Sequence, residues 1–319
     1  MTFSDCLLRH RWRLKYSQQE MTVRLSWLDD EFKDLSLVTY SRWERNVNMP
    51  SIKKILKILI FFKEDLLDFY INTPFKPSMI EEKAFNRFLA YYYYFNDYWA
   101  LCSYGVHEHP VFTEHDENNP FTETGKIQGS LRKFIEISEL YRKSPDEKIT
   151  LQKRGVMKLL TCKSEQGELL THTGWILFPD SKKAIITNSI LNGGKEIIPI
   201  QKDLSVSTTE PSVMFMRPIL HFSREWFDFV LNKIISTLLL NSNIKEIILP
   251  TRTIDSSKEL LQFGFNVVKT ECSAKNLKQN KQKGLELRIM RISSVDLLSN
   301  YGLNMWFKEY QHKKMMPST

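Results

Sequence analysis

The sequence predicts an α + α/β protein with an all-helical domain at residues 1–76, a helical linker at 77–148 and a mixed α/β domain at 149–319. Three observations predict this fold class. Apolar residues recur at helical spacing through the first domain, Pro74 and Pro77 interrupt that pattern, and short strand-like runs dominate the last part. A chain of 319 residues is long enough for two domains with separate cores.

Composition indicates a folded cytoplasmic protein. Hydrophobic residues make up 42% of the chain, yet no apolar run reaches the roughly 18 residues of a membrane-spanning helix. Asp5 and scattered arginines stand where a signal peptide would be apolar, so we expect neither export nor a membrane partner. The four cysteines are far apart and form no CxxC pair. This pattern predicts reduced thiols, with no zinc knuckle or disulfide framework. We expect no cofactor.

The charge is compatible with a nucleic-acid partner. The formal net charge is +8 and the pI is near 9.1. The first 75 residues nevertheless hold nearly as many acidic as basic side chains. Binding by this domain therefore depends on where its charges lie.

Three local signals predict the N-terminal helices. Ser17-Gln18-Gln19-Glu20 is a capping box that opens a helix running to about Leu25. Ser36 can cap a helix from Leu37 to Arg45, and Pro50-Ser51 precedes a further helix with an apolar stripe.

Together with Leu7–Arg11 and Thr39–Arg45, these segments resemble the Xre/Cro (lambda-repressor-like) helix-turn-helix family over about a quarter of the chain. Two features depart from that family. About eight extra residues, part of Ser26 to Leu35, precede the helix that begins at Leu37, and Asn46 stands where the family has glycine. Asparagine can also adopt the left-handed conformation required there.

The resemblance implies that the helix from Leu37 lies in the major groove of double-stranded DNA. The side chains that this would present to DNA are Ser36, Leu37, Val38, Ser41, Arg42 and Arg45. Arg42 suits guanine, because a guanidinium can donate to both O6 and N7. Gln18 is expected to contact phosphate.

The same resemblance implies structural roles and an assembly. Arg11 is expected to pair with Glu44; independently of the resemblance, Trp43, Leu14 and Val23 are expected in the core. Regulators of this family bind paired half-sites as dimers, so a homodimer is implied.

The linker carries two groups of interest. The aromatic helical stretch from Ile80 to Tyr104 is interpreted as a buried interdomain or dimer helix; base stacking and a ligand pocket are the alternatives. His107-Glu108-His109, with residues 114–117, is interpreted as a solvated polar loop running to Gly129, the alternative being a metal site. A further helix is expected from Leu131 to Arg142.

The last part alternates strands and helices. The expected strands are 156–161, 170–178, 184–190, 197–200, 213–220, 244–249, 265–268 and 285–292. The expected helices are 224–240 and 257–263, followed by a terminal helix over about 303–316. The lysine-rich stretch 275–283 is interpreted as a solvated loop, with a phosphate-contacting loop as the alternative.

Residues 213–268, ending in Ser257–Phe265, resemble the GNAT acyltransferase fold. That family binds the pyrophosphate of coenzyme A with an [R/Q]xxGx[G/A] loop, which would fall on Arg217–Phe222 here. Bulky residues occupy both small positions and Pro218 lacks an amide hydrogen, so acetyl-CoA binding in the usual manner is not expected. Glu225, Asp228 and His221 are the nearest acid/base groups, and no catalytic residue is assigned.

The favoured interpretation is a DNA-binding transcriptional regulator whose GNAT-like domain senses a small-molecule or acyl ligand, mediates dimerisation, or does both. The alternative is an acyltransferase, or an enzyme like acyl-homoserine-lactone synthases, that carries a DNA-binding module. A third class is an adaptor whose main partner is another protein.

Overall fold

The computed structural model describes residues 2–103, 110–121, 145–167, 169–191, 210–216, 223–270 and 285–315. Its contacts divide the chain into two compact units. Unit 1 comprises Met1–Phe85, Ile235–Ser242 and Val295–Thr319; unit 2 comprises Asn86–Ile234 and Asn243–Ser294. Residues 295–319, which the sequence assigns to the C-terminal domain, thus group with the N-terminal helices. Within the described ranges, no helix is long and apolar enough to cross a membrane.

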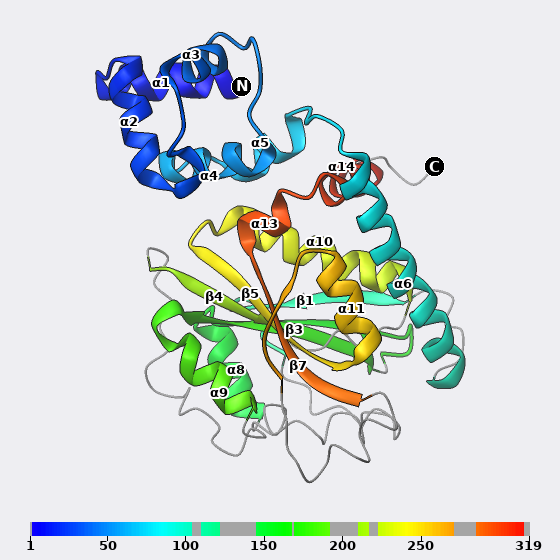
Figure 1. Ribbon diagram of the computed structural model, residues 1–319. Coiled ribbons are helices and arrows are strands. Elements are labelled where there is room, and N and C mark those ends of the chain that lie inside the picture. Colours follow the sequence, from blue (N-terminus) through cyan, green and yellow to red (C-terminus); the bar gives the residue numbers. More distant parts are fainter. Residues whose placement is uncertain are drawn as a thin grey trace. The chain divides into compact units, whose positions relative to one another are not determined.

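Unit 1 is helical (Figure 1). Its N-terminal elements are α1 (Phe3–Leu14), α2 (Gln18–Leu28), the 3-10 helix η1 (Asp30–Phe32), α3 (Leu37–Glu44), α4 (Ile52–Phe62) and α5 (Leu66–Asn72). Side chains cap the first backbone N–H groups of the helices, as the sequence predicts for Ser17 and Ser36, and Ser51 caps α4 in the same way. The capping box between Ser17 and Glu20 is confirmed.

The extra residues before α3 form structure of their own. The helix expected to end near Leu25 continues to Leu28, and η1 follows it. Phe32 in η1 is fully buried, so this insertion adds to the core of the unit. Asn46 has a φ of 55°, which confirms the left-handed conformation expected after α3.

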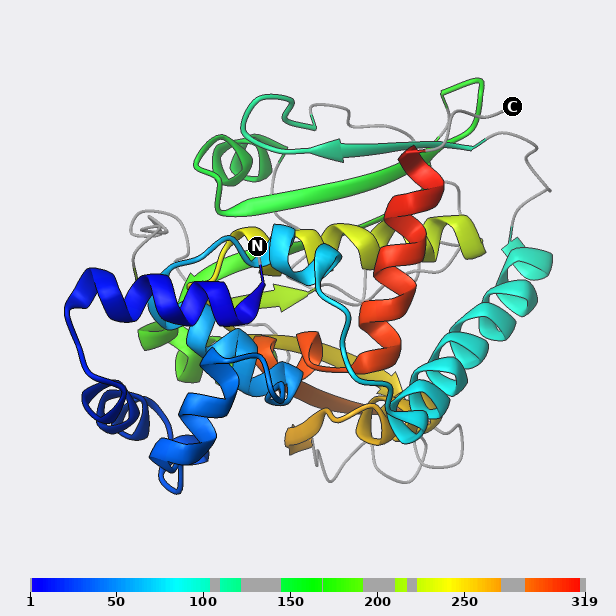
Figure 2. The ribbon, with the colours of Figure 1, turned by 90° about the horizontal axis from the view of Figure 1, so that it is seen from above.

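The C-terminal helices complete unit 1. They are α13 (Ser294–Leu298), most of which belongs to this unit, and α14 (Tyr301–Met315), drawn in red in Figure 2. Tyr70 of α5 donates from its hydroxyl to the Leu298 carbonyl at 2.9 Å, and its ring lies 5.8 Å from that of Phe307. Asn304 donates to the Tyr70 carbonyl at 3.1 Å. The terminal helix expected from the sequence therefore packs on α5.

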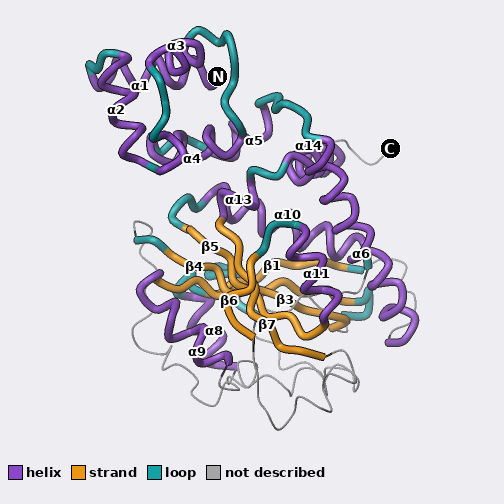
Figure 3. The backbone as a smooth tube through the Cα atoms, in the orientation of Figure 1, coloured by secondary structure: helices purple, strands orange, loops and turns teal. Residues whose placement is uncertain are grey.

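Unit 2 contains a seven-stranded sheet in the order β1-β2-β3-β4-β5-β7-β6 (Figure 3). The strands are β1 (Val111–His115), β2 (Met157–Lys163), β3 (Leu169–Pro179), β4 (Ser212–Met216), β5 (Ile244–Thr253), β6 (Asn266–Thr270) and β7 (Leu285–Ser293). Only β4 and β5 pair in parallel; the other neighbouring strands are antiparallel. This mixed arrangement agrees with the fold class expected from the sequence.

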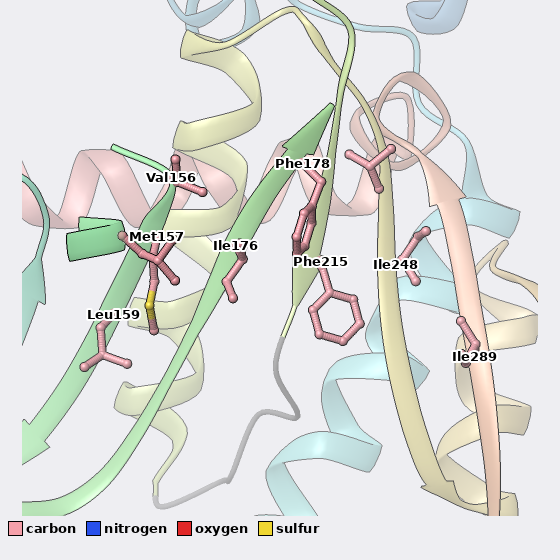
Figure 4. Close-up of a cluster of buried hydrophobic side chains, with 10 residues drawn as sticks. Val156, Met157, Leu159, Ile176, Phe178, Phe215, Ile248 and Ile289 are labelled. Carbon is pink, nitrogen blue, oxygen red and sulfur yellow. The ribbon is translucent and has the colours of Figure 1, made fainter. Parts of the chain in front are cut away.

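Helices cover both faces of this sheet. On one face, Leu151 of α8 (Pro145–Lys153) joins a buried cluster with Met157, Ile176 and Phe215 (Figure 4). On the other face lies α10 (Arg224–Leu240), where the ring of Trp226 is 5.8 Å from that of Phe112. Because both faces are covered, the central strands are apolar on both sides.

Further helices of unit 2 are α9 (Lys183–Leu191), after the 3-10 turn η3 (Asp180–Lys182), and α11 (Ile254–Gln262). The aromatic stretch of the linker is part of α6 (Met79–Ser103). Within unit 2, Phe88 stacks on Phe263 at 4.5 Å and Tyr92 on Phe227 at 5.2 Å. These two side chains pack against α10 and the end of α11, in agreement with a buried helix.

Two sequence expectations are wrong. Residues 184–190, expected as a strand, lie in α9, where Thr187 donates to the Lys183 carbonyl one turn earlier. The branched residues there suit either structure, and tertiary context decided for the helix. The polar segment expected as a loop contains β1, which is stabilised by pairing with β2. The expected helix 131–142, strand 197–200 and loop 275–283 lie outside the described residues.

Candidate nucleic-acid interface

Glu44 is the centre of a buried polar network in unit 1. Its Oε1 accepts hydrogen bonds from Arg11 Nε at 2.6 Å and from the Tyr40 hydroxyl at 2.9 Å. Its Oε2 accepts from Gln18 Nε2 at 2.7 Å. One carboxylate therefore joins α1, α2 and α3, and fixes how α3 lies against the other two helices.

The environment keeps these donors protonated. Burial, and then the Glu44 charge, raise the pKa of Tyr40 far above its ordinary value. The hydrogen bond to Glu44 raises the pKa of Arg11 despite the opposing effect of burial. The structure thus brings together Arg11 and Glu44, the pair that the sequence resemblance implies, and adds Tyr40, whose role the sequence did not indicate.

The outer face of α3 carries the side chains proposed to meet DNA. Leu37 is 44% exposed and Val38 is 59% exposed, and Arg42 is exposed as well. Ser36 is the exposed N-cap and Ser41 is half-buried. Meanwhile Tyr40, Trp43 and Glu44 on the inner face are buried.

Arg45 lies at the end of the same helix. It is exposed, and its Nε donates to the Ser41 carbonyl at 3.2 Å. The guanidinium thus caps the last turn of α3 while remaining accessible. The six candidate residues therefore lie along one short helix and its N-cap, with two guanidinium groups at its second half.

The start of α2 differs from the phosphate site expected there. Gln18 already donates to Glu44, and Glu20 Oε2 accepts from the Ser17 amide at 2.7 Å. A carboxylate at a helix N-terminus satisfies the amide groups that a phosphate would otherwise bind. A phosphate at this point would have to approach Gln18 beside the Glu20 charge.

Two expected core positions are wrong. Trp43 is 4% exposed, as expected, but Leu14 is 40% exposed and Val23 is 43% exposed. Leu14 is the last residue of α1, and Met21 and Leu25 take the inner positions of α2. Helical spacing alone allowed either stripe of α2 to face inwards.

Sequence reasoning also missed a cluster formed by Cys6, His10 and Glu64. Potential ligand atoms of these three residues all lie within 4.8 Å of one another. Burial, and then the Glu64 charge, raise the pKa of Cys6 to about 11. The available signal was the spacing of Cys6 and His10 four residues apart on one helix, which puts both on the same face.

Among the described residues of unit 2, the candidate groups on β1 are engaged in separate contacts. His115 is buried on β1 with Nε2 2.9 Å from Thr161 Oγ1, and Glu114 binds Lys158 and Lys233. The solvated-loop interpretation is therefore wrong for these two residues. His107 and His109 lie outside the described residues.

Two of the acid/base candidates, Glu225 and Asp228, lie on α10. Glu225 is exposed, whereas Asp228 accepts from the Tyr93 hydroxyl at 2.6 Å. Arg224 lies over the Tyr93 ring, 4.6 Å from its centroid. His221 and the rest of 217–222 are outside the described residues.

Comparisons with known proteins found no matching protein-family model and no matching curated protein. Among solved structures, the chain is similar to arylalkylamine N-acetyltransferase 2 from Aedes aegypti, with 13% identity over 51% of this chain and 86% of that one, at a TM-score of 0.31. It is similar to spermidine N-acetyltransferase from Vibrio cholerae, with 11% identity over 59% and 98% of the two chains, at a TM-score of 0.28. The AHL synthase LasI gives 13% identity over 61% and 95%, at a TM-score of 0.30. Scores this low establish no shared activity.

Proposed function

We propose that this protein binds double-stranded DNA in a sequence-specific manner, with α3 as the recognition helix, and acts as a transcriptional regulator. The observation that carries the proposal is the two-sided character of α3. Its inner face is fixed to α1 and α2 through Glu44, while its outer face presents Ser36, Leu37, Val38 and Arg42 to solvent, together with the half-buried Ser41.

This arrangement fits the chemistry of the major groove. A preorganised helix with exposed side chains at its N-terminal end can enter the groove without reordering the backbone. Arg42 can donate to two acceptors of guanine, and Leu37 and Val38 offer apolar surface to a thymine methyl group. Gln18 would then lie next to the sugar-phosphate backbone through its side chain, while Glu20 occupies the N-cap amide group of α2.

The proposal includes a homodimer on paired half-sites, because one α3 reads too few base pairs for useful specificity. The test is selection of binding sites from a random DNA library with the full-length protein, followed by salt-titrated binding to the best site. An inverted repeat bound far more tightly than shuffled DNA is expected. Salt-dependent binding without base preference, or no binding, would contradict the proposal.

A second candidate function is acyl transfer, or the binding of an acyl ligand by unit 2. Its support is the segment that resembles the GNAT fold, where α11 is followed by Gly264 at a φ of 108° and then by β6. The apolar residues Leu260, Phe263 and Phe265 of that segment are buried. They anchor it against the sheet that contains the parallel β4–β5 pair.

Calorimetric titration with acetyl-CoA and with an acyl carrier protein separates the two functions. Saturable binding of either would support acyl chemistry. Specific DNA binding without any acyl ligand would leave unit 2 as a dimerisation or protein-binding unit.

A further inference from the structure

In the part of the chain that the structure describes, one group of potential metal ligands, soft and hard, lies close together: Cys6, His10 and Glu64. The thiol, an imidazole nitrogen and a carboxylate oxygen lie within 4.8 Å of one another. Cys6 and His10 are buried, and the Glu64 side chain is 18% exposed. Such a mixed set within one small volume differs from the exposed acidic clusters that are common on protein surfaces.

The local fold explains why these residues meet. Cys6 and His10 are four residues apart in α1 and so lie on one face. Lys63, the C-cap of α4, has a φ of 58°, and the Glu64 amide donates back to the Leu59 carbonyl at 3.0 Å. This left-handed turn directs Glu64 back towards α1.

Neighbouring side chains orient the three groups. The His10 ring stacks on Phe62 with centroids 4.1 Å apart and an interplanar angle of 1°. Arg9 Nη2 lies 2.7 Å from Glu64 Oε2. Arg13 Nη2 lies 2.9 Å from His10 Nδ1. Arginines therefore engage His10 Nδ1 and Glu64 Oε2, while His10 Nε2 and Glu64 Oε1 are directed at each other.

We propose that Cys6 Sγ, His10 Nε2 and a Glu64 carboxylate oxygen bind one Zn²⁺, with water as the fourth ligand. Thiolate, imidazole and carboxylate are ligands that zinc accepts in tetrahedral sites. In a tetrahedral site, ligand atoms about 2.0–2.3 Å from zinc lie roughly 3.3–3.8 Å from one another. Side-chain rotations that move these atoms by about 1 Å would therefore complete the site.

The protons balance. An arginine can only donate, so Arg13 makes Nδ1 the acceptor in the metal-free state, and Nε2 carries the proton that faces Glu64. On binding, Cys6 releases its thiol proton to solvent, and the imidazole proton moves to Nδ1 as the exposed Arg13 turns away. Thiolate and carboxylate then cancel the charge of the ion inside the unit.

The test is titration of reduced, chelator-treated full-length protein with Co²⁺, which reports its ligands through absorption. A sulfur-to-cobalt charge-transfer band saturating at about one equivalent is expected. Cys6→Ser should abolish the band, and His10→Gln or Glu64→Gln should weaken Co²⁺ binding at least about tenfold. Cys162→Ser is the matched control, because Cys162 is also buried but belongs to unit 2 and to no ligand cluster found in the described residues. It should leave the band unchanged.

A band that survives Cys6→Ser, or no band in the wild-type protein, would overturn the proposal and leave His10 and Glu64 as an ordinary hydrogen-bonded pair. If the variants fail to fold, cadmium NMR on the unmodified protein decides, because the cadmium shift depends on the number of sulfur ligands. A cadmium shift typical of one sulfur ligand together with nitrogen and oxygen ligands supports the site. A shift typical of oxygen ligands alone contradicts it.

Discussion

Arg11 Nε lies 2.6 Å from Glu44 Oε1, and this ion pair between residues 33 positions apart joins α1 to α3. The Glu44 side chain is only 1% exposed, so the donors around it must offset the free-energy cost of burying its carboxylate. The helix proposed to read DNA is therefore positioned by a buried carboxylate on its inner face.

Replacing Arg11 with Met is expected to lower the free energy of unfolding by about 3 kcal/mol, because it leaves a buried carboxylate without its cationic partner. Denaturant unfolding followed by circular dichroism measures the change. Lys33→Met is the control, since Lys33 pairs with Asp30 where both side chains are largely exposed. An equal effect of the two replacements would refute the importance of the Arg11–Glu44 pair.

Gln18→Ala is expected to weaken binding to all DNA sequences alike, since its proposed contact is with phosphate. It should also lower stability by about 1 kcal/mol, because Glu44 Oε2 loses a donor. Fluorescence anisotropy on a series of site variants measures the first effect. Gln19→Ala, an exposed neighbour, serves as the control. A changed base preference would assign Gln18 to base contact instead.

Arg42→Ala is expected to weaken binding to the best site by roughly 1–3 kcal/mol and to relax preference at one base position. Arg42→Lys keeps the charge but loses the paired donors, so it should recover non-specific affinity only. Competition binding against every single-base variant of the site is the measurement. Equal loss on every sequence would mean that Arg42 contacts phosphate.

Unit 2 is expected to lose stability in acid through Glu114. Burial raises the pKa of Glu114, but the hydrogen bonds from Lys158 and Lys233 lower it by more than burial raises it, so the net shift is downwards. The resulting stabilisation is present above the ordinary value of 4.5 and disappears as the pH falls through the lower, folded-state pKa. Glu114→Gln should flatten the decline of unfolding free energy below pH 4.5, whereas replacing the exposed Glu165 should not. Parallel curves for all three proteins would disprove this.

Trp43→Ala is expected to cost about 3–5 kcal/mol of stability, because the indole fills the core between the helices. Val23→Ala should cost less than about 1 kcal/mol, since Val23 is 43% exposed. Thermal unfolding of the two variants makes the comparison. Similar losses would mean that Val23 is buried by a partner in solution.

Local chemistry explains what could be predicted in unit 1. Ser17, Ser36 and Ser51 cap their own helices through bonds to the third following residue, and Asn46 tolerates a positive φ. These signals span only a few residues and do not depend on distant packing. The starts of these three helices, including the candidate recognition helix, were therefore predictable.

The errors arose where a pattern allowed two answers. Residues 184–190 suited either a strand or a helix, and Val23 could have faced the core as readily as Met21 does. Contacts with distant parts of the chain decide such cases. His115 became part of a strand because β2 lies beside it, a neighbour more than 40 residues away in the chain.

By itself, the sequence determined the mixed helix-and-sheet fold class, the three helices that start at Ser17, Ser36 and Ser51, and the side chains on the outer face of α3. Tertiary structure alone decided that Gln18 bonds to Glu44, that α14 packs on α5, and that Glu64 meets Cys6 and His10. The physical reason is the separation along the chain over which each kind of interaction acts. Caps and helical periodicity act over a few residues, whereas these contacts need chain segments brought together from 26 to more than 200 residues apart, which only the packing of the whole unit accomplishes.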